Sequence, residues 1–381
     1  MINFIIDLIL GCAIAVGVIY SFLLLLITIR EFCFPQKSAS LSHFPEISIL
    51  KPLKGLEDHL EENLRSFFTL NYPKYEILFG VSEIDDPSIP IVNKLCCEYP
   101  DIPTRLIIDA HRIGLNPKIN NLFNIYQKAS YNYILISDSN VRVDPSYLHD
   151  MVTTINQPNT GLVTSTIRGI SARRIGSILD NLYMNSFVAP SVFFIKKIIN
   201  LPISIGKSML FRREVLEKIG GFQALRNMLA EDHMLGEAIR QLGLEVRISA
   251  KPVNSVNENW SIQNFISRHS RWAKLRRNLN PFYYFLELLS HPIAMSLVYL
   301  LFHLNPIGLF IFSGILVYKI TVEMVIDRLV QSDLKWYHYL FLPLKDMVMA
   351  GIWFIPYVSR TVSWRGNKFK IEKNTLLSPI T

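Results

Sequence analysis

Cysteine is scarce in this sequence, and its placement offers little covalent or metal chemistry. Only four cysteines occur among 381 residues, at positions 12, 33, 96 and 97. Their spacing matches neither a zinc-ligand pattern nor the framework of a disulfide-rich domain. Cys96 and Cys97 fall in a helical pattern and are predicted to be packing residues in a reducing compartment. A disulfide-stabilised extracellular module and a cysteine-ligated zinc domain are therefore excluded.

Nucleic-acid-binding motifs are absent as well, although the chain is basic. Lys and Arg number 39 against 31 Asp and Glu, which gives a formal net charge of +8. Half of the residues are hydrophobic, and the mean hydropathy of +0.26 is high for a soluble protein. The excess positive charge is therefore predicted to face a membrane surface and anionic phosphates rather than nucleic acid.

The N-terminal stretch NFIIDLILGCAIAVGVIYSFLLLLITIR is long enough to cross a bilayer. Residues 4–29 are apolar apart from Asp7, Ser21 and Thr28, and about 20 residues suffice for a transmembrane helix. Because no basic leader or small-residue cleavage site accompanies the run, a signal anchor is predicted, with a buried core helix as the alternative. Arg30 and Lys37 follow it, so the positive-inside bias predicts that the next segment is cytoplasmic.

Residues 46–256 alternate between strand-like and helix-like patterns. Strands are predicted at EISILK, YEILFGVS, TRLII and YILISD, and helices at LEDHLEENLRSFFTL, PSIPIVNKLCCEY and NPKINNLFNIYQKA. Strands separated by helices of this length are typical of βαβ units and a parallel sheet. The strands are continuous apolar runs, which indicates that helices cover both faces of the sheet.

After residue 280 the sequence becomes strongly apolar again. HPIAMSLVYLLF and IGLFIFSGILVYKITVEMVI, separated by HLNP, predict a tight helical hairpin through a bilayer. A third run, YLFLPLKDMVMAGIWFIPYV, contains Lys345 and Asp346. It either crosses with this pair facing protein or water, or dips back. The basic tail prefers the cytoplasm, whereas three full C-terminal crossings would place it outside, so the number of crossings stays open.

One internal segment is too apolar for a solvated loop. Residues 186–206, SFVAPSVFFIKKIINLPISIG, contain two prolines that interrupt the hydrophobic pattern. Two interpretations fit equally well. The segment is either an interfacial element that shapes a lipid-facing mouth or a plain core helix.

Polar side chains stand at the ends of three predicted strands. Lys51 and Lys54 follow the first strand, Asp86 follows the second within an Asp-Asp pair, and Asp138 ends YILISD. Ligands of open α/β sheets bind at the carboxyl ends of the strands, so these groups are predicted to share one rim. Ordinary polar turns are the alternative.

The residues from Asp138 to Asn140 resemble the D-x-D signature of nucleotide-sugar glycosyltransferases, with Asn in place of the second acid. A nucleoside diphosphate carries several negative charges and is commonly held together with a hard divalent cation. Mg²⁺ and Mn²⁺ prefer oxygen ligands, which they share between one or two carboxylates and substrate phosphates. Asp138 is therefore a candidate metal ligand.

Two later segments carry further candidates. Glu231 and Asp232 open a predicted helix, where they either cap the helix or supply a general base. In SRHSRWAKLRRN, Arg268, Arg271 and Trp272 occupy positions i, i+3 and i+4 of one helix face. Such arginines suit bidentate contacts to phosphate and the indole suits stacking on a sugar. A juxtamembrane helix on anionic lipid headgroups is the alternative.

Together these motifs resemble the ceramide glucosyltransferases, membrane-bound relatives of the processive glycan synthases. That family shows three aspartate sites followed by (Q/R)-x-x-R-W, and this chain carries EIDDPS, SDSNVRV, AEDHMLGEAI and RHSRW in the same order. Strings such as GLNPKINNL, GKSMLF and VSWRGNKFKI extend the likeness from about residue 46 to near the end. The chain departs from it at Ala189-Pro190, where animal members carry His-Pro on the expected acceptor side.

The resemblance implies a GT-A fold, an α/β architecture with a Rossmann-like, mixed and mostly parallel sheet, flanked by N- and C-terminal transmembrane helices. The implied domains are an N-terminal anchor (residues 1–32), a cytoplasmic catalytic domain (43–283) and C-terminal transmembrane helices with a basic tail (284–381). The implied roles are nucleotide contacts at Asp86, metal and diphosphate binding at Asp138, the general base at Asp232, a phosphate contact at Lys118, and contacts between diphosphate and acceptor at Arg268, Arg271 and Trp272.

The implied reaction is inverting transfer of a hexose, glucose from UDP-glucose being the favoured case, to the primary hydroxyl of a membrane lipid such as ceramide. The implied cofactor is Mg²⁺ or Mn²⁺, and the implied partners are a UDP-sugar, the lipid acceptor and the bilayer, with no nucleic acid. The protein is expected to be multi-pass, in the plasma membrane if bacterial. The alternatives are N-acetylglucosaminyl or hexosyl transfer to another lipid such as a hopanoid, and non-catalytic binding of a sugar nucleotide or lipid. A processive polysaccharide synthase is disfavoured, because few apolar runs are available to line a channel.

Overall fold

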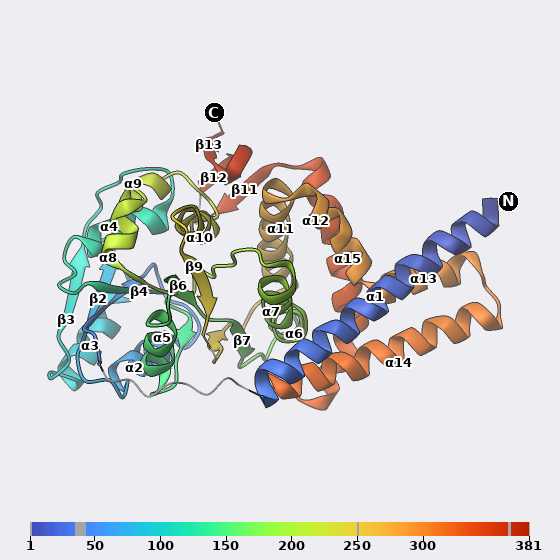
Figure 1. Ribbon diagram of the computed structural model, residues 1–381, viewed down its shortest axis with the longest axis horizontal. Coiled ribbons are helices and arrows are strands. Elements are labelled where there is room, and N and C mark those ends of the chain that lie inside the picture. The colour runs from blue at the N-terminus through green and yellow to red at the C-terminus, as the bar shows by residue number, and fades with distance from the viewer. Residues whose placement is uncertain (1, 35–42, 250, 365–366, 381) are drawn as a thin grey trace.

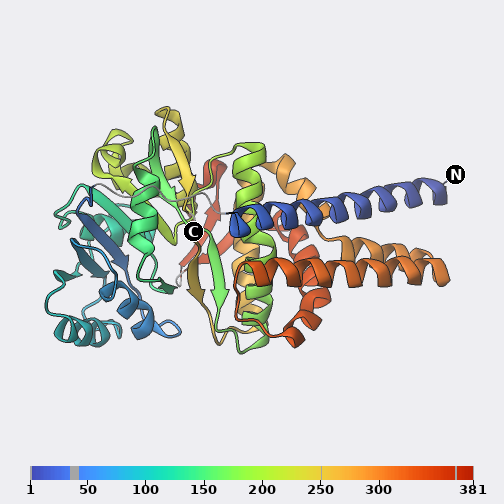
Figure 2. The same ribbon diagram turned by 60° about the horizontal axis from the view of Figure 1, so that its bottom comes forward.

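The computed structural model of the chain describes residues 2–34, 43–249, 251–364 and 367–380. An α/β unit forms one end of the molecule, and three helices project from the other end (Figures 1 and 2). These helices are α1 (Ile2–Cys33), α13 (Pro292–Phe302) and α14 (Pro306–Leu329). Segments from opposite ends of the sequence therefore build one helical bundle. The orientation of the first apolar run was predicted from two cations, Arg30 and Lys37, and Lys37 lies outside the described residues.

A seven-stranded sheet forms the centre of the α/β unit. Its strand order is β3-β2-β1-β4-β8-β6-β9, and neighbours run parallel except where β8 pairs antiparallel with β4 and β6. The mixed and mostly parallel sheet is thus confirmed. The strands are β1 (Ile47–Pro52), β2 (Tyr75–Val81), β3 (Thr104–Ile108), β4 (Tyr133–Ser137), β6 (Thr160–Thr164), β8 (Ser208–Arg212) and β9 (Glu245–Ile248).

Helices cover both faces of this sheet, as the continuous apolar strands predicted. Alternate strand residues point to opposite sides: Ile49 and Ile77 join one apolar cluster, whereas Leu50 and Leu78 join another. The first cluster is closed by α2 (Leu60–Phe68), α3 (Ile89–Glu98) and α5 (Tyr147–Ile155). The second is closed by α4 (Pro117–Tyr126), α8 (Arg213–Lys218), α9 (Gly221–Leu225) and α10 (Glu231–Gln241).

Two smaller sheets connect the α/β unit to its surroundings. β5 (Val141–Arg142), β10 (Val253–Val256) and β7 (Ile167–Ile170) form one of them, in the order β5-β10-β7. β11 (Thr361–Trp364), β12 (Asn367–Ile371) and β13 (Leu377–Pro379) form the other near the C-terminus. Val362, Phe369 and Ile371 of this last sheet pack with Leu229, just before α10. The C-terminal strands therefore lie against the catalytic half of the chain.

The segment around Ala189 is helical throughout. α6 (Ile175–Tyr183), the π-helical turn η1 (Met184–Val188), α7 (Ala189–Phe194) and the π-helical turn η2 (Ile195–Ile199) follow one another without a break. Pro190 does not end the run, because the wider π-turn before it adjusts the backbone where proline lacks an N–H. This run packs on α11 (Ile262–Leu279), and most of it is buried in protein. Both interpretations of residues 186–206 therefore remain.

Several helices are long and apolar enough to cross a membrane. Within the described part of the chain there are four, or five if a bent pair counts as one span. They are Phe4–Cys33, Ile175–Ile199, Pro306–Leu329 and Trp336–Val358, together with the pair Pro281–Ser290 and Pro292–Phe302, bent by 64°. The predicted hairpin corresponds to α13 and α14, and His303 in the turn between them contacts Asp7 of α1.

The Lys345-Asp346 pair of the third C-terminal run faces protein, and a charge cluster surrounds it. Both residues lie in α15 (Leu342–Val358) and are almost fully buried. Glu323 of α14 accepts contacts from Lys345 Nζ at 2.6 Å and from Lys319 Nζ at 2.7 Å. Ser186 of η1 donates to the same carboxylate at 2.6 Å. Two buried cations and two buried acids thus balance one another and join α14, α15 and η1.

Replacing Glu323→Gln should destabilise the protein strongly, because two buried lysines lose their shared countercharge. Breaking a buried ion pair in this way costs about 3 kcal/mol or more. Thermal unfolding of the purified protein in detergent measures the effect. Glu237→Gln is the matched control, because its exposed partner Arg240 lies on the same surface turn and such pairs contribute roughly 0–1 kcal/mol. Equal unfolding temperatures for the two variants would contradict the role of Glu323.

Candidate active site

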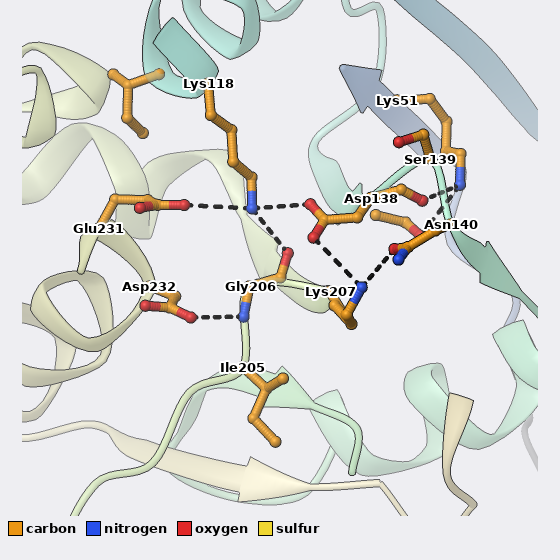
Figure 3. A network of polar contacts seen from close by, with 12 residues as sticks. Lys51, Lys118, Asp138, Ser139, Asn140, Ile205, Gly206, Lys207, Glu231 and Asp232 are labelled. Atoms are coloured by element: carbon orange, nitrogen blue, oxygen red, sulfur yellow. Dashed lines mark hydrogen bonds and ion pairs between the residues drawn. The ribbon is translucent and has the colours of Figure 1, made fainter. Parts of the chain in front are cut away.

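Polar residues from five segments meet at the carboxyl end of the central strands (Figure 3). β1 contributes Lys51, the tip of β4 contributes Asp138, and the first turn of α4 contributes Lys118. The loop before β8 adds Lys207, and the first turn of α10 adds Asp232. Because β1 and β4 are parallel neighbours, their ends open on the same edge of the sheet. The predicted shared rim is therefore present for β1 and β4.

Asp138 lies among three lysines. Lys118 Nζ is 2.8 Å from Asp138 Oδ1, and Lys207 Nζ is 3.9 Å from Oδ2. Lys51 Nζ donates to the backbone carbonyl of Asp138 at 2.6 Å. The Asp138 side chain remains 29% exposed, so a ligand can reach it from solvent.

Burial and neighbouring charges shift the pKa values of these three lysines. Burial lowers the pKa of Lys51 to about 7 and that of Lys207 to about 8, although Asp138 opposes both shifts. Burial also acts to lower the pKa of Lys118, but Asp138 and Glu231 outweigh it and hold that pKa above its usual value. Lys118 is therefore fully charged near neutral pH, Lys207 is mostly charged, and a nearby anion would favour the charged form of Lys51. This arrangement suits a diphosphate.

Asp232 meets the same cluster from α10. Its Oδ2 accepts a hydrogen bond from the Gly206 N–H at 2.8 Å, and its Oδ1 accepts from the His233 N–H at 2.8 Å. Lys118 Nζ donates to the Gly206 carbonyl at 3.1 Å. Asp138 and Asp232 are thus joined by three successive contacts, through Lys118 and Gly206 (Figure 3).

Glu231 precedes Asp232 but is buried beside Lys118. Its Oε1 lies 3.2 Å from Lys118 Nζ, and it is buried, whereas Asp232 is partly exposed. Burial raises the pKa of Glu231, and Lys118 opposes that rise. Glu231 therefore supports Lys118 from inside the protein, and Asp232 is the acid of this pair that is open to a substrate.

Asp86 lies outside this cluster and contacts the loop that follows β1. Its Oδ2 accepts from the Gly55 N–H at 2.9 Å, and its Oδ1 accepts from the Ser88 hydroxyl at 2.6 Å. Burial would raise the pKa of Asp86, but these hydrogen bonds together lower it, so the carboxylate stays ionised. Gly55 follows β1, the strand that carries Lys51, and has a φ of 68° that favours glycine. Asp86 thus holds the β1 loop beside the site.

Arg268, from the RHSRW motif of α11, is buried in a pocket of aromatic and acidic groups. Its guanidinium lies 5.0 Å from the ring centre of Trp260 and 4.5 Å from that of Trp272, in cation–π geometry. Arg268 donates to Asp180 of α6 at 2.9 Å, and His269 contacts the other oxygen of that carboxylate at 2.9 Å. The predicted meeting of Arg268 and Trp272 on one helix face is confirmed. Arg271 lies on the same helix and is partly exposed.

A line of amides connects this motif to Asp138. Lys207 donates to the Asn140 side-chain oxygen, and Asn140 Nδ2 donates to Asn257 Oδ1 at 3.0 Å. Asn257 Nδ2 donates in turn to Asp180 Oδ2 at 3.2 Å. Asn140, which replaces the second acid of the D-x-D pattern, thus links the sheet edge to α6 and α11.

A divalent cation fits this site only with help from its substrate. No group of three His, Cys, Asp or Glu side chains is placed to hold a metal in the described ranges of the chain. Asp138 supplies one carboxylate that is 29% exposed, whereas the Asn140 amide oxygen already accepts from Lys207. Mg²⁺ commonly takes one or two carboxylates and completes its shell with substrate phosphates and water. The residues present fit a cation of that kind.

Comparison with known proteins decides the family. The model of glycosyl transferase family 21 matches residues 9–377. The chain belongs to this family. It is 29% identical over 373 residues to ceramide glucosyltransferase 3 of Caenorhabditis elegans, covering 93% of this chain and 80% of that relative. It is 26% identical over 342 residues to ceramide glucosyltransferase 1 of the same organism, covering 86% and 72%. The chain is thus a sugar-transferring enzyme.

Solved structures support the fold. A mannosyltransferase of Pyrobaculum calidifontis, solved in complex with GDP-Man and Mn²⁺, matches with a TM-score of 0.54 and 17% sequence identity. The match covers 93% of this chain and 97% of the other. The predicted GT-A architecture and the resemblance to the ceramide glucosyltransferases are both confirmed.

The structure also reveals residues that the sequence patterns did not single out for the site. Asp180 lies in an apolar stretch of helix, Lys207 lies in the string GKSMLF, to which no chemical role was given, and Asn257 lies in a segment without a motif. A lone acid in an apolar helix is a signal for function, and it would have pointed to Asp180. Lys207 and Asn257 gain their meaning only from contacts with residues that are more than 60 positions away.

Gly206→Ala should lower sugar transfer about tenfold or more. A Cβ at this position would lie 3.0 Å from Asp232 Oδ2 and 3.0 Å from Lys118 Nζ, so both groups would have to move. Crowding of this kind costs roughly 1–3 kcal/mol, and the middle of this range corresponds to more than about tenfold in rate. Steady-state kinetics measure the change. Gly351→Ala is the control, since its Cβ would meet open space; the same rate in both variants would rule out the tight fit.

Asp180→Asn should reduce the transfer rate by about 10²-fold, because it removes the charge that orients Arg268 and His269. Asparagine preserves the size of the side chain, so the fold is expected to survive. Turnover at saturating donor and the affinity for UDP should be measured together, and turnover is expected to fall more than affinity. Asp150→Asn serves as the control, because Asp150 pairs with Lys251 3.3 Å away, at a separate place. Matching kinetics for the two variants would refute the positioning role.

Proposed function

We propose that the enzyme transfers glucose from UDP-glucose, with inversion, to the primary hydroxyl of ceramide or a closely related membrane lipid. The observation that carries this proposal is the pairing of Asp232 with the lysine-rich surroundings of Asp138 across Gly206. One side offers a partly exposed carboxylate and the other offers three ammonium groups. The names of the C. elegans relatives support glucose and ceramide as substrates.

Asp232 is proposed as the general base. The N–H groups of Gly206 and His233 orient its two oxygens and leave further lone pairs for an incoming hydroxyl. As the proton passes to Asp232, the lipid oxygen forms a bond to the anomeric carbon on the face opposite UDP. The bond between that carbon and the diphosphate oxygen breaks, and its electron pair leaves with UDP.

The lysines and the arginine motif are proposed to hold the donor. Lys118, Lys207 and Lys51 would neutralise charge on the diphosphate, because all three ammonium groups lie around Asp138. Asp138 would hold Mg²⁺ or Mn²⁺ together with the substrate phosphates, and the cation would supply charge neutralisation when bound. Arg271 and Trp272 would face the junction of diphosphate and acceptor, with Arg268 fixed behind them by Asp180. Asp86 would border the nucleotide.

The helical bundle is proposed to deliver the lipid. α1, which contains most of the anchor (1–32), and α14 would cross the membrane, and α13, 11 residues long, would cross together with the preceding helix of the bent pair. The catalytic domain (43–283) and the tail of the C-terminal region (284–381) would both be cytoplasmic. The turn between α13 and α14 lies beside the N-terminal end of α1, where His303 meets Asp7, which supports side-by-side crossing. α15 packs on α11 and α6 of the catalytic side. It would therefore lie at the membrane interface, and this arrangement agrees with a basic cytoplasmic tail.

The acceptor is the part of the proposal with a specific alternative. Ala189 is buried in α7, at the position where the resemblance led us to expect histidine. Another lipid, such as a hopanoid receiving a hexose or N-acetylglucosamine, is therefore a second candidate. Expression in a host that lacks glycolipids, followed by mass spectrometry of the lipid extract, separates the cases. A new hexosylceramide supports ceramide, and a glycosylated hopanoid supports the alternative.

Asp232→Asn should abolish transfer while UDP-glucose still binds. Loss of a general base typically costs about 10²–10⁴-fold in rate, and asparagine can still accept a hydrogen bond from Gly206. Radiolabelled transfer to lipid and equilibrium binding of UDP should be measured on the same preparation. Glu237→Gln, an exposed change on the same helix, is expected to leave both unchanged. Near-normal turnover in Asp232→Asn would remove this residue from the base role.

A further inference from the structure

A second cavity lies outside the candidate active site. It has a volume of about 290 Å³ and is bordered by the end of α11, the start of α12 (Pro281–Glu287), the end of α15 and the C-terminal sheet. This volume is near the lower end of the roughly 300–1,000 Å³ of small-molecule sites. Pro281, the first residue of α12, and Pro356, near the end of α15, both line it. The cavity is therefore enclosed by parts of the chain that are far apart in sequence.

Positive charge dominates the lining. Four of the lining residues are cations, and one is an acid. The cations are Lys274, Arg277, Arg360 and Lys373. The single acid, Glu372, already pairs with Lys370 at 3.0 Å. The cavity thus has a clear excess of positive charge and suits an anion.

Two of these cations are held in fixed positions. Lys274 Nζ donates to the Thr361 carbonyl at 2.6 Å, and Arg277 donates to the Pro356 carbonyl at 2.9 Å. Arg277 also lies 4.4 Å from the ring centre of Tyr357. These contacts leave further N–H groups on both side chains available for a ligand. Arg360 and Lys373 are exposed at the opening.

Exposed apolar side chains lie on the two helices that start and end at this cavity. Phe282 and Phe285 of α12 are 67% and 57% exposed, and Phe354 and Val358 of α15 are 58% and 85% exposed. α12 and α15 pack together, since the Phe285 and Trp353 ring centres are 6.0 Å apart. α12 leads through η3 (Leu288–Ser290) into α13, so the cavity lies where the chain passes from the α/β unit into the bundle (Figure 1).

We infer that this cavity binds the phosphate-bearing headgroup of an anionic phospholipid. The lysine and arginine side chains meet the phosphate, and the exposed apolar residues of α12 and α15 contact the interfacial part of the bilayer. A soluble phosphate would gain nothing from the apolar residues, which is why a lipid is the chosen ligand. The inference goes beyond sugar transfer: it rests on the proposed membrane location and not on the reaction.

The lipid would also bear on the active site, because the cavity and the arginine motif share α11. Lys274 and Arg277 follow Arg268 and Trp272 on that helix by about half a turn to two and a half turns. A bound headgroup would fix the C-terminal end of α11 against α15 and the C-terminal sheet. Anionic lipid is therefore a second ligand of the helix that carries the donor-binding motif.

The test uses the full-length protein in neutral detergent. Dioctanoyl phosphatidylglycerol, dioctanoyl phosphatidylcholine and inorganic phosphate are titrated separately, and binding is followed by native mass spectrometry and calorimetry. Phosphatidylglycerol is expected to bind at least tenfold more tightly than either of the other two. Equal binding of phosphatidylcholine would overturn the charge argument. Inorganic phosphate that binds as tightly as phosphatidylglycerol would show a soluble-anion site and overturn the lipid assignment.

Matched charge variants locate the binding. Arg360→Gln with Lys373→Gln should weaken phosphatidylglycerol binding about tenfold or more, and Arg360→Gln alone should give an intermediate loss. Lys128→Gln with Lys218→Gln removes the same net charge from exposed positions near α4 and α8, far from α12 (Figure 1), and should bind like the parent. All these positions are exposed, so unfolding temperatures without lipid should agree. Equal lipid affinity of the two double variants would overturn the proposed site.

Discussion

One buried ammonium group holds the catalytic edge of this enzyme together. Lys118 Nζ lies 2.8 Å from Asp138, 3.2 Å from Glu231 and 3.1 Å from the Gly206 carbonyl, which come from three separate segments. Without its acids the buried lysine would lose its charge, and without the lysine the acids would repel one another. The tip of β4, the start of α10 and the loop before β8 thus depend on one balance of charge. The same balance places Asp232 beside the cations that suit a diphosphate.

The α/β unit and the apolar helices also share a polar interior. Asp180 belongs to a helix apolar enough to cross a membrane, yet it is fully buried and binds Arg268 and His269 of the RHSRW motif. Further along the same run, Ser186 binds Glu323, which pairs with Lys345. The candidate active site and the buried charge cluster of the apolar helices are therefore coupled through one helical segment. A change in the packing of this segment would therefore affect the contacts of Asp180 and those of Glu323.

Most of the sheet was predictable, because its first four strands are continuous apolar runs between helices with regular spacing. β8 was less accessible to prediction, since its antiparallel placement between β4 and β6 depends on pairing across distant segments. In the site, Asp138, Asp232 and the Arg268–Trp272 pair carry motif signals. Lys207 lies in GKSMLF, which supports the family likeness but assigns no chemistry, and Asn257 carries no motif signal. A lysine or asparagine of this kind acquires a role only through a partner brought close by the fold. The number of membrane crossings was open because apolarity alone does not distinguish a buried helix from a spanning one.

Because residue 140 of the D-x-N motif is an asparagine, the hydrogen bonds that connect Lys207 with Asp180 all run in one direction. Every donor from Lys207 through Asn140 and Asn257 points the same way, toward the Asp180 carboxylate. A carboxylate at position 140 has no hydrogen to donate. Its oxygen would face Asn257 Oδ1, and this hydrogen bond would be lost. Restoring the second acid would thus not repair an incomplete motif. At this position an amide, which both accepts and donates, fits the contacts on its two sides.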